Sequence, residues 1–318
     1  MNNDLSSYFE DPEFKEALEK YEGMVKNHTP AYFDADELTD IAEYYASKGR
    51  QIEAEAAIDF ALQLHPNDTD ALIFRARSLA MKGRLDEAYM VMDLIEDRSD
   101  REVRFLKADL LMEEKRMEEA DHVFEELAAY EEGKLETLID IILAYIDANQ
   151  EALAKKWIKH VGETYDLASL SQKNQKFRDL LCDFYITFNN PEAAIPLLQA
   201  TLDCYPYSIN HWNSLGKCYL STNDYEEAHE AIDFALAIDD SNAEALTLKA
   251  FCYQQSGELQ KSCDYYLRLA EQQENKTRAY LALAKTYFEM QDYTSSIYYI
   301  EALLDNKDAL SKYELSEL

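Results

Sequence analysis

Small and bulky side chains recur along this chain at a fixed spacing. The clearest copy begins at Trp212 and reads Trp-Asn-Ser-Leu-Gly-Lys-Cys-Tyr, followed by Ala228 and Ile232. The position of its tyrosine is always Tyr or Leu: Tyr45, Leu79, Leu111, Tyr145, Tyr185, Tyr219, Tyr253 and Tyr287. The position nine residues later is always small: Ala54, Ala88, Ala120, Ala154, Ala194, Ala228, Ser262 and Ser296. Antiparallel helices approach closely only where one side is small, so the pattern predicts a series of packed helix pairs.

A second small position lies three residues before the tyrosine position. It holds Ala, Cys or Gly in every copy except one, where Ile142 stands: Ala42, Ala76, Ala108, Cys182, Gly216, Ala250 and Ala284. Turn-forming residues separate the two helices of most copies: Gly49, Gly83, Asn149, Asn189, Asn223 and Gly257. Glycine and asparagine tolerate the left-handed conformation that ends a helix, so each copy is predicted to be helix, turn, helix.

The copies define eight predicted repeats. Their boundaries are 35–68, 69–100, 101–134, 135–174, 175–208, 209–242, 243–276 and 277–310. The fourth repeat is the longest, and its extra residues lie near 162–174. We expect a longer loop or extended helix ends there, at a point where the array would bend or divide into two blocks.

Segments outside the array are predicted to cover its ends. Residues 1–34 contain an expected capping helix at 11–27, because Pro12 suits a first helical turn and Phe14, Leu18 and Tyr21 share one face. Residues 311–318 form a short C-terminal tail. This tail is too small to seal the last repeat, so we expect a monomer, or weak self-association through the C-terminal end.

The spacing Trp-x2-Leu-Gly-x2-Tyr, then Ala228, resembles the tetratricopeptide repeat family, whose period is about 34 residues. The resemblance covers most of the chain. It implies an all-α fold, a right-handed superhelical α-solenoid of about eight repeats. It also implies that the first helix of each repeat lines a concave face, and that ligands bind at positions flanking the tryptophan and small positions.

Net charge narrows the range of partners. The 318 residues carry 63 Asp and Glu against 31 Lys and Arg, which gives a formal net charge of −32. Binding to nucleic acid or to anionic membranes requires clustered basic residues, so neither is an expected partner. A basic or amphipathic protein segment suits this charge better; the alternative is that the acidic faces only keep the protein soluble and monomeric. The first residues show no secretory signal and no apolar run is long enough to span a membrane, so we expect a cytoplasmic protein.

No signature of catalysis, metal binding or cofactor binding is found in the sequence. The seven glycines form no phosphate-binding loop, and the six histidines lack the spacing of a metal site. The five cysteines form no close pairs, and we interpret Cys182, Cys218 and Cys252 as reduced thiols of the core. We therefore predict a non-enzymatic protein with no metal and no cofactor.

Ten residues are candidates for the partner-binding groove that the resemblance implies: Arg77, Phe105, Asp109, Asp183, Asn210, Asn213, Lys217, Phe251, Arg278 and Lys285. The first five repeats offer mainly acidic residues and the last three offer amide and basic ones. We hypothesise that the last three repeats receive an acidic segment, with Phe251 as an apolar anchor beside Lys217. The alternative is that these residues only balance local charge. The family's two-carboxylate clamp is not predicted, because Asn213 precedes Lys217 in reversed order and Leu248 and Ala282 replace clamp residues.

Two functions remain open from the sequence. The first is a protein-protein interaction scaffold or adaptor that binds a peptide or helix of a partner in its concave groove. The alternative is a structural subunit of a larger assembly that docks by its ends or its convex face. An exposed apolar groove would favour the first function and an uncovered apolar end the second.

Overall fold

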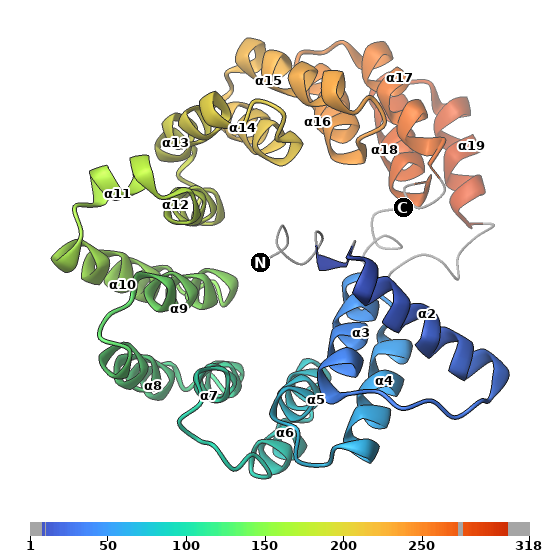
Figure 1. Ribbon diagram of the computed structural model, residues 1–318. Coiled ribbons are helices and arrows are strands. Elements are labelled where there is room, and N and C mark those ends of the chain that lie inside the picture. Colours follow the sequence, from blue (N-terminus) through green and yellow to red (C-terminus); the bar gives the residue numbers. More distant parts are fainter. Residues whose placement is uncertain (1–7, 10, 273–275, 305–318) are drawn as a thin grey trace. The chain divides into compact units, whose positions relative to one another are not determined.

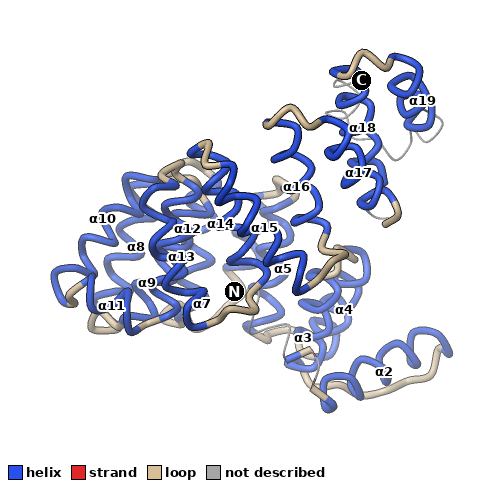
Figure 2. The backbone as a smooth tube through the Cα atoms, turned by 90° about the horizontal axis from the view of Figure 1, so that it is seen from above, coloured by secondary structure: helices blue, strands red, loops and turns tan. Residues whose placement is uncertain are grey.

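The structure is a computed structural model that describes residues 8–9, 11–272 and 276–304. Across these residues every regular element is a helix, from α2 to α19, and no strand occurs (Figures 1 and 2). The predicted all-α fold class is confirmed. The predicted C-terminal tail, 311–318, lies outside the described residues.

Sixteen helices form pairs in chain order. We call the first members A helices: α3 (Ala35–Ser47), α5 (Thr69–Met81), α7 (Arg101–Glu113), α9 (Leu135–Asp147), α12 (Gln175–Thr187), α14 (Ile209–Thr222), α16 (Ala243–Gln255) and α18 (Lys276–Glu289). The second members are B helices: α4 (Gln51–Leu64), α6 (Leu85–Met92), α8 (Met117–Tyr130), α10 (Glu151–Thr164), α13 (Pro191–Cys204), α15 (Tyr225–Ile238), α17 (Leu259–Ala270) and α19 (Tyr293–Leu304). The helices begin close to the positions where the predicted repeats and turns place them.

The turns between paired helices adopt the predicted left-handed conformation. All six predicted Gly and Asn residues have positive φ, from 53° at Asn189 to 78° at Gly257. Lys115 (φ 63°) and Gln291 (φ 61°) take the same place in the third and eighth repeats. Neither residue type favours this conformation, so these two turns could not be predicted from the residues at these positions.

Helix α2 (Pro12–Asn27) precedes the first pair. The Asp11 carboxylate accepts a hydrogen bond from the Glu13 backbone N–H at 2.8 Å and caps the helix start. The helix buries Phe14, Ala17 and Tyr21, and its Phe14 ring lies 5.5 Å from the ring of Tyr44 on α3. Helix α2 therefore covers apolar surface of the first repeat.

The extra residues of the fourth repeat form a separate helix, α11 (Leu167–Lys173), where the sequence suggested a loop or longer helix ends. Arg178 of α12 is almost fully buried and holds this helix in place. Its guanidinium donates to the backbone carbonyls of Ser171 and Gln172 at 3.2 and 3.3 Å, and to the Thr201 hydroxyl at 2.8 Å. A cation at the C-terminal carbonyls of a helix satisfies acceptors that the helix leaves unpaired.

The chain divides into two compact units, residues 1–138 and 139–318, which we call unit 1 and unit 2. The boundary falls inside α9, whereas the sequence suggested a division near 162–174. The inserted α11 packs on α12 instead of separating blocks. In unit 1, α3 and α5 contact each other, as do α5 and α7; in unit 2, α14 and α16 do the same.

Gly216 marks the closest approach of α14 and α15. A Cβ atom at this position would lie 2.7 Å from Cγ1 of Ile232, which is closer than carbon atoms can pack. The equivalent residue of the second repeat is Ala76, fully buried in one core cluster with Met92, the counterpart of Ile232. The small position therefore has a different size limit in these two repeats.

Four cysteines are buried and one is exposed. Loss of hydration raises the pKa of the Cys182 thiol to about 12 and the pKa values of the Cys218 and Cys263 thiols to about 11. Burial also raises the pKa of Cys252. Cys204, at the end of α13, is the exposed thiol.

Candidate functional site

Some of the ten predicted groove residues are accessible to solvent in the structure and others are buried. Phe105 and Asn213 are buried, with 7% and 1% of their surface exposed, which differs from the sequence prediction. Phe105 packs in the core against Phe124, with ring centroids 5.2 Å apart. The remaining residues are exposed or partly exposed: Arg77, Asp109, Asp183, Asn210, Lys217, Phe251, Arg278 and Lys285.

A carboxylate of the chain itself engages the two central residues predicted to receive an acidic segment. The Lys217 ammonium pairs with the Glu244 carboxylate, and the Asn213 amide donates to the same carboxylate at 3.0 Å. Asn213 also donates to the Asn242 side chain at 3.1 Å. Glu244 therefore occupies the hydrogen-bond donors that the sequence analysis assigned to a ligand.

Unit 1 has a pocket of about 600 Å³ on its A-helix side, which we call the acidic pocket. It is lined by residues of α3, α5 and α7 and by Tyr8: Tyr8, Asp36, Thr39, Asp40, Glu43, Asp70, Ile73, Phe74, Arg77 and Glu102. Five of these side chains are carboxylates and one is a cation. The Arg77 guanidinium lies 3.5 Å from Glu102 and 3.6 Å from Asp109.

Carboxylates in the acidic pocket hold their protons more tightly than solvated ones. Loss of hydration raises the pKa values of Asp40, Glu43 and Asp70, and neighbouring carboxylates raise each of them further. Tyr8 donates a hydrogen bond to Asp40 at 2.5 Å, and this bond is the main reason that the pKa of Tyr8 rises to about 12. A bound cation would relieve the repulsion among these groups.

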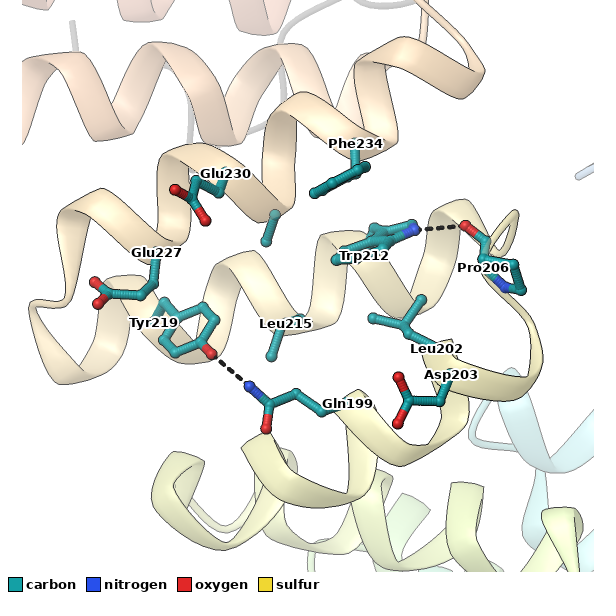
Figure 3. A pocket seen from close by; sticks show the side chains of 11 residues that line it. Gln199, Leu202, Asp203, Pro206, Trp212, Leu215, Tyr219, Glu227, Glu230 and Phe234 are labelled. Carbon is teal, nitrogen blue, oxygen red and sulfur yellow. Dashed lines mark hydrogen bonds between the residues drawn. The ribbon is translucent and has the colours of Figure 1, made fainter.

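Unit 2 has a groove on its B-helix side, between α13 and α15 and above α14, which we call the B groove (Figure 3). Its volume is about 480 Å³. The buried side chains of Leu202, Leu215 and Ala231 form an apolar floor, and the rings of Trp212 and Phe234 stack with centroids 4.5 Å apart. The remaining lining residues are mostly polar: Gln199, Asp203, Pro206, Tyr219, Glu227 and Glu230.

Unit 1 has an equivalent groove of about 340 Å³ between α4 and α6, which we call the matched groove. Lining residues of the two grooves lie 140 positions apart: Leu62 and Leu202, Pro66 and Pro206, Leu72 and Trp212, Arg75 and Leu215, Leu79 and Tyr219, Glu87 and Glu227, Val91 and Ala231, Leu94 and Phe234. The matched groove contains Arg75, paired with Asp59, and Arg84, which donates to Glu87 at 2.6 Å.

The repeat pattern behind both grooves is that of a known family. The family model described as tetratricopeptide repeat matches residues 39–89 and 213–276, which lie in the first two and in the sixth and seventh predicted repeats. The chain contains tetratricopeptide repeats. The family identified from the sequence is thereby confirmed.

Other proteins share this architecture. The NrfG subunit of the formate-dependent nitrite reductase complex of Escherichia coli O157:H7 is 26% identical over 191 residues, which are 58% of this chain and 89% of NrfG. A tetratricopeptide repeat protein from Parabacteroides merdae matches with a TM-score of 0.50 and 16% identity, over 79% of this chain and 98% of that one. The APC/C hetero-tetramer Cut9-Hcn1 matches with a TM-score of 0.50 and 17% identity, over 89% of this chain and 48% of that one. The two solved structures support the fold alone.

In unit 2, the side chains of a serine, a histidine and an aspartate lie next to one another in space. The Ser208 hydroxyl lies 2.6 Å from Nδ1 of His211, and Nε2 of His211 lies 3.4 Å from Asp179. Ser208 is the N-cap residue of α14, and His211 follows one turn later. The Ser208 hydroxyl makes no capping hydrogen bond to the backbone, and a polar side-chain contact across the first turn is ordinary for a helix start. We therefore interpret these contacts as local to the start of α14.

The described residues contain no group of His, Cys, Asp or Glu side chains that could hold a metal ion. In the same part of the chain, no helix is both long and apolar enough to cross a membrane. The B groove was not predicted from the sequence, because ligand contacts were expected at A-helix positions that flank the tryptophan and small positions. The acidic residues Asp203, Glu227 and Glu230 beside Trp212 were the available signal.

Proposed function

We propose that this tetratricopeptide repeat protein is a non-catalytic interaction scaffold that binds a basic segment of a partner protein in the acidic pocket of unit 1. The observation that carries the proposal is the gathering of five carboxylates around Ile73 and Phe74. Tetratricopeptide repeats form protein-protein interaction surfaces, and a pocket on the A helices is where such a surface would lie.

Electrostatics favours a cationic ligand at this pocket. Loss of hydration and, after it, neighbouring carboxylates raise the pKa values of Asp40, Glu43 and Asp70. Arg77 balances one charge, so an excess of negative charge remains near neutral pH. A lysine or arginine side chain would gain several carboxylate partners, while Ile73 and Phe74 would contact the apolar stem of that side chain.

The test uses a dye-labelled peptide of alternating lysine and leucine, with fluorescence anisotropy as the readout. We expect saturable binding to the native chain, weakened about tenfold in Asp40→Asn/Glu43→Gln at low salt. The control is Asp86→Asn/Glu118→Gln, which makes the same charge change on B helices of unit 1. Equal weakening by both variants would show a general effect of net charge and contradict the assignment.

The predicted acidic ligand of the last three repeats becomes a second, conditional proposal. An acidic peptide would have to replace Glu244 on the exposed Lys217, because Asn213 is buried. We therefore expect a glutamate-rich peptide to bind Glu244→Gln several-fold more tightly than the native chain, measured by the same anisotropy assay. If the native chain and the variant bind it equally, Lys217 is not its receptor.

The alternative function, a structural subunit that docks by its ends or its convex face, remains a separate proposal. Exposed apolar side chains on α19, Ile297 and Tyr298, are compatible with docking near the C-terminal end. Ile297→Ser/Tyr298→Ser should then change the oligomeric state in analytical ultracentrifugation. A cytoplasmic location also remains a proposal, which fractionation of source cells would test.

A further inference from the structure

The B groove of unit 2 combines an apolar floor with an acidic rim. Leu202 and Leu215 on its floor are each 4% exposed, so their side chains are packed but still line the groove. Asp203 lies at one end of the groove, and Glu227 and Glu230 extend from α15 along the other side (Figure 3). The partner residue that suits such a site is an apolar side chain flanked by cations.

Two aromatic rings give the groove a rigid, accessible surface. The Trp212 indole N–H donates to the Pro206 carbonyl at 2.8 Å, which fixes the ring beside the loop after α13. Phe234 stacks on that ring and is still 54% exposed. An ordered, exposed aromatic pair provides apolar contact at little cost in side-chain entropy, and it also attracts an arginine guanidinium.

The rim carboxylates have no counterions of their own. Among the described residues, Asp203, Glu227 and Glu230 form no ion pair. In the matched groove of unit 1 the equivalents of Asp203 and Glu230 are Gln63 and Met90. That groove instead contains two arginines, each already paired with a carboxylate.

We propose that the B groove is a second docking site, which binds a partner segment carrying one large apolar side chain between arginine or lysine residues. The apolar side chain lies against Leu215 and the Trp212–Phe234 pair, and the cations pair with Asp203 and Glu230. This site goes beyond the proposed function, because it lies in a different unit and on B helices. The charge complementarity excludes an acidic ligand.

The test uses Trp212 as a reporter located in the groove. The chain has two tryptophans, and Trp157 is buried in α10, so Trp157→Phe leaves Trp212 as the source of tryptophan fluorescence. The probe is a short peptide with a leucine between pairs of arginines. We expect a saturable change in Trp212 fluorescence, and dissociation as salt is raised.

Two variants locate the contacts. Asp203→Asn/Glu230→Gln should weaken binding about tenfold at low salt, and Phe234→Ala should weaken it by a similar factor. The matched control, Glu192→Gln/Glu226→Gln, makes the same charge change on the same helices outside the groove and should bind like the parent. All these side chains are exposed, so circular dichroism should show unchanged folding.

Several outcomes would overturn the proposal. They are no saturable binding, equal affinity in the rim variant and its control, equal affinity when the leucine of the peptide is replaced by serine, and tighter binding of a glutamate-containing peptide. A concentration-dependent Trp212 signal without peptide would assign the groove to a second copy of the chain. The variant Asp40→Asn/Glu43→Gln should leave the Trp212 response intact, so failure of the acidic pocket and failure of the B groove are distinguishable.

Discussion

Unit 1 and unit 2 carry their uncompensated carboxylates on opposite sides of the repeats. In unit 1 the acidic pocket lies on A helices, and the arginines of the matched groove are paired. In unit 2 the acidic B groove lies between B helices, while Lys217 on the A-helix side is paired with Glu244. One repeat framework therefore supports two different surfaces.

This difference shows how the repeat separates folding from recognition. Equivalent floor residues such as Leu62 and Leu202 keep the grooves similar, because they face the core in both units. Exposed positions are free of that constraint, so Met90 and Glu230 can differ without changing the helix pairing. The partner is therefore expected to depend on a few rim residues.

The largest expected effect concerns one pair of equivalent lining residues in the two grooves, Leu79 and Tyr219. Leu79, in the matched groove, is 7% exposed, and Leu79→Ala should lower the free energy of unfolding by about 2–5 kcal/mol. Its equivalent Tyr219 is partly exposed, and its hydroxyl accepts a hydrogen bond from Gln199. Tyr219→Ala should therefore cost less, about 1–3 kcal/mol. Urea denaturation would measure both, and a larger loss at Tyr219 would contradict the difference in burial.

The next largest effect is expected at the small position of the sixth repeat, Gly216. Gly216→Ala should destabilise the protein by about 1–3 kcal/mol, because the new methyl group would overlap Ile232. The second substitution Ile232→Met recreates the Ala76–Met92 pair of unit 1 and should recover part of the loss. Gly23→Ala in α2 is the control, since its methyl group would meet nothing within 4 Å, and it should stabilise by about 0.5–1 kcal/mol. Stabilisation by Gly216→Ala would show that α14 and α15 can move apart.

A smaller effect comes from giving the matched groove the residues of the B groove. Arg75→Leu/Arg84→Asp should increase affinity for the arginine-leucine peptide about fivefold, measured in a chain whose B groove carries Asp203→Asn/Glu230→Gln. Removing two cations leaves Glu87 unpaired and available. If the folded variant shows no gain, groove shape and not charge separates the two surfaces.

The smallest effect is a pH dependence of stability. Because the pKa of Glu43 is raised in the folded protein, this carboxylate opposes folding at neutral pH, and its cost disappears as pH falls through the raised pKa. Glu43→Gln should therefore raise the melting temperature slightly at pH 7 and have no effect near pH 4. Glu53, whose pKa is lowered by a backbone hydrogen bond and by Arg50, should show the opposite sign. A Glu43→Gln effect that is constant with pH would contradict the assigned cause.

The repeat pattern of helices and turns was predictable from the sequence because local backbone geometry restricts which residues can occupy its main positions. Ala228, Gly216 and Asn223 each identify a position where the backbone allows few side chains, and the structure places them at a helix contact or a left-handed turn. Ile142 is the one bulky residue at the small position three residues before the tyrosine position, and it is fully buried on α9. The helix pairing therefore tolerates one bulky exception.

Charge pairing was not predictable in the same way. Glu244 lies 27 residues after Lys217, and their contact depends on which way two flexible side chains turn between neighbouring A helices. The B groove was missed because ligand contacts were expected at A-helix positions that flank the tryptophan and small positions, although comparison with positions 140 residues earlier would have shown the missing arginines. Side-chain partners between repeats require the structure.

The distribution of thiols has a practical consequence. Alkylation and oxidation act on the exposed thiolate, so the four buried cysteines should be spared and Cys204 should react alone. A single dye or spin label can therefore be attached at the end of α13, next to Asp203, without engineering the chain. The same asymmetry limits oxidative cross-linking of the native chain to a covalent dimer.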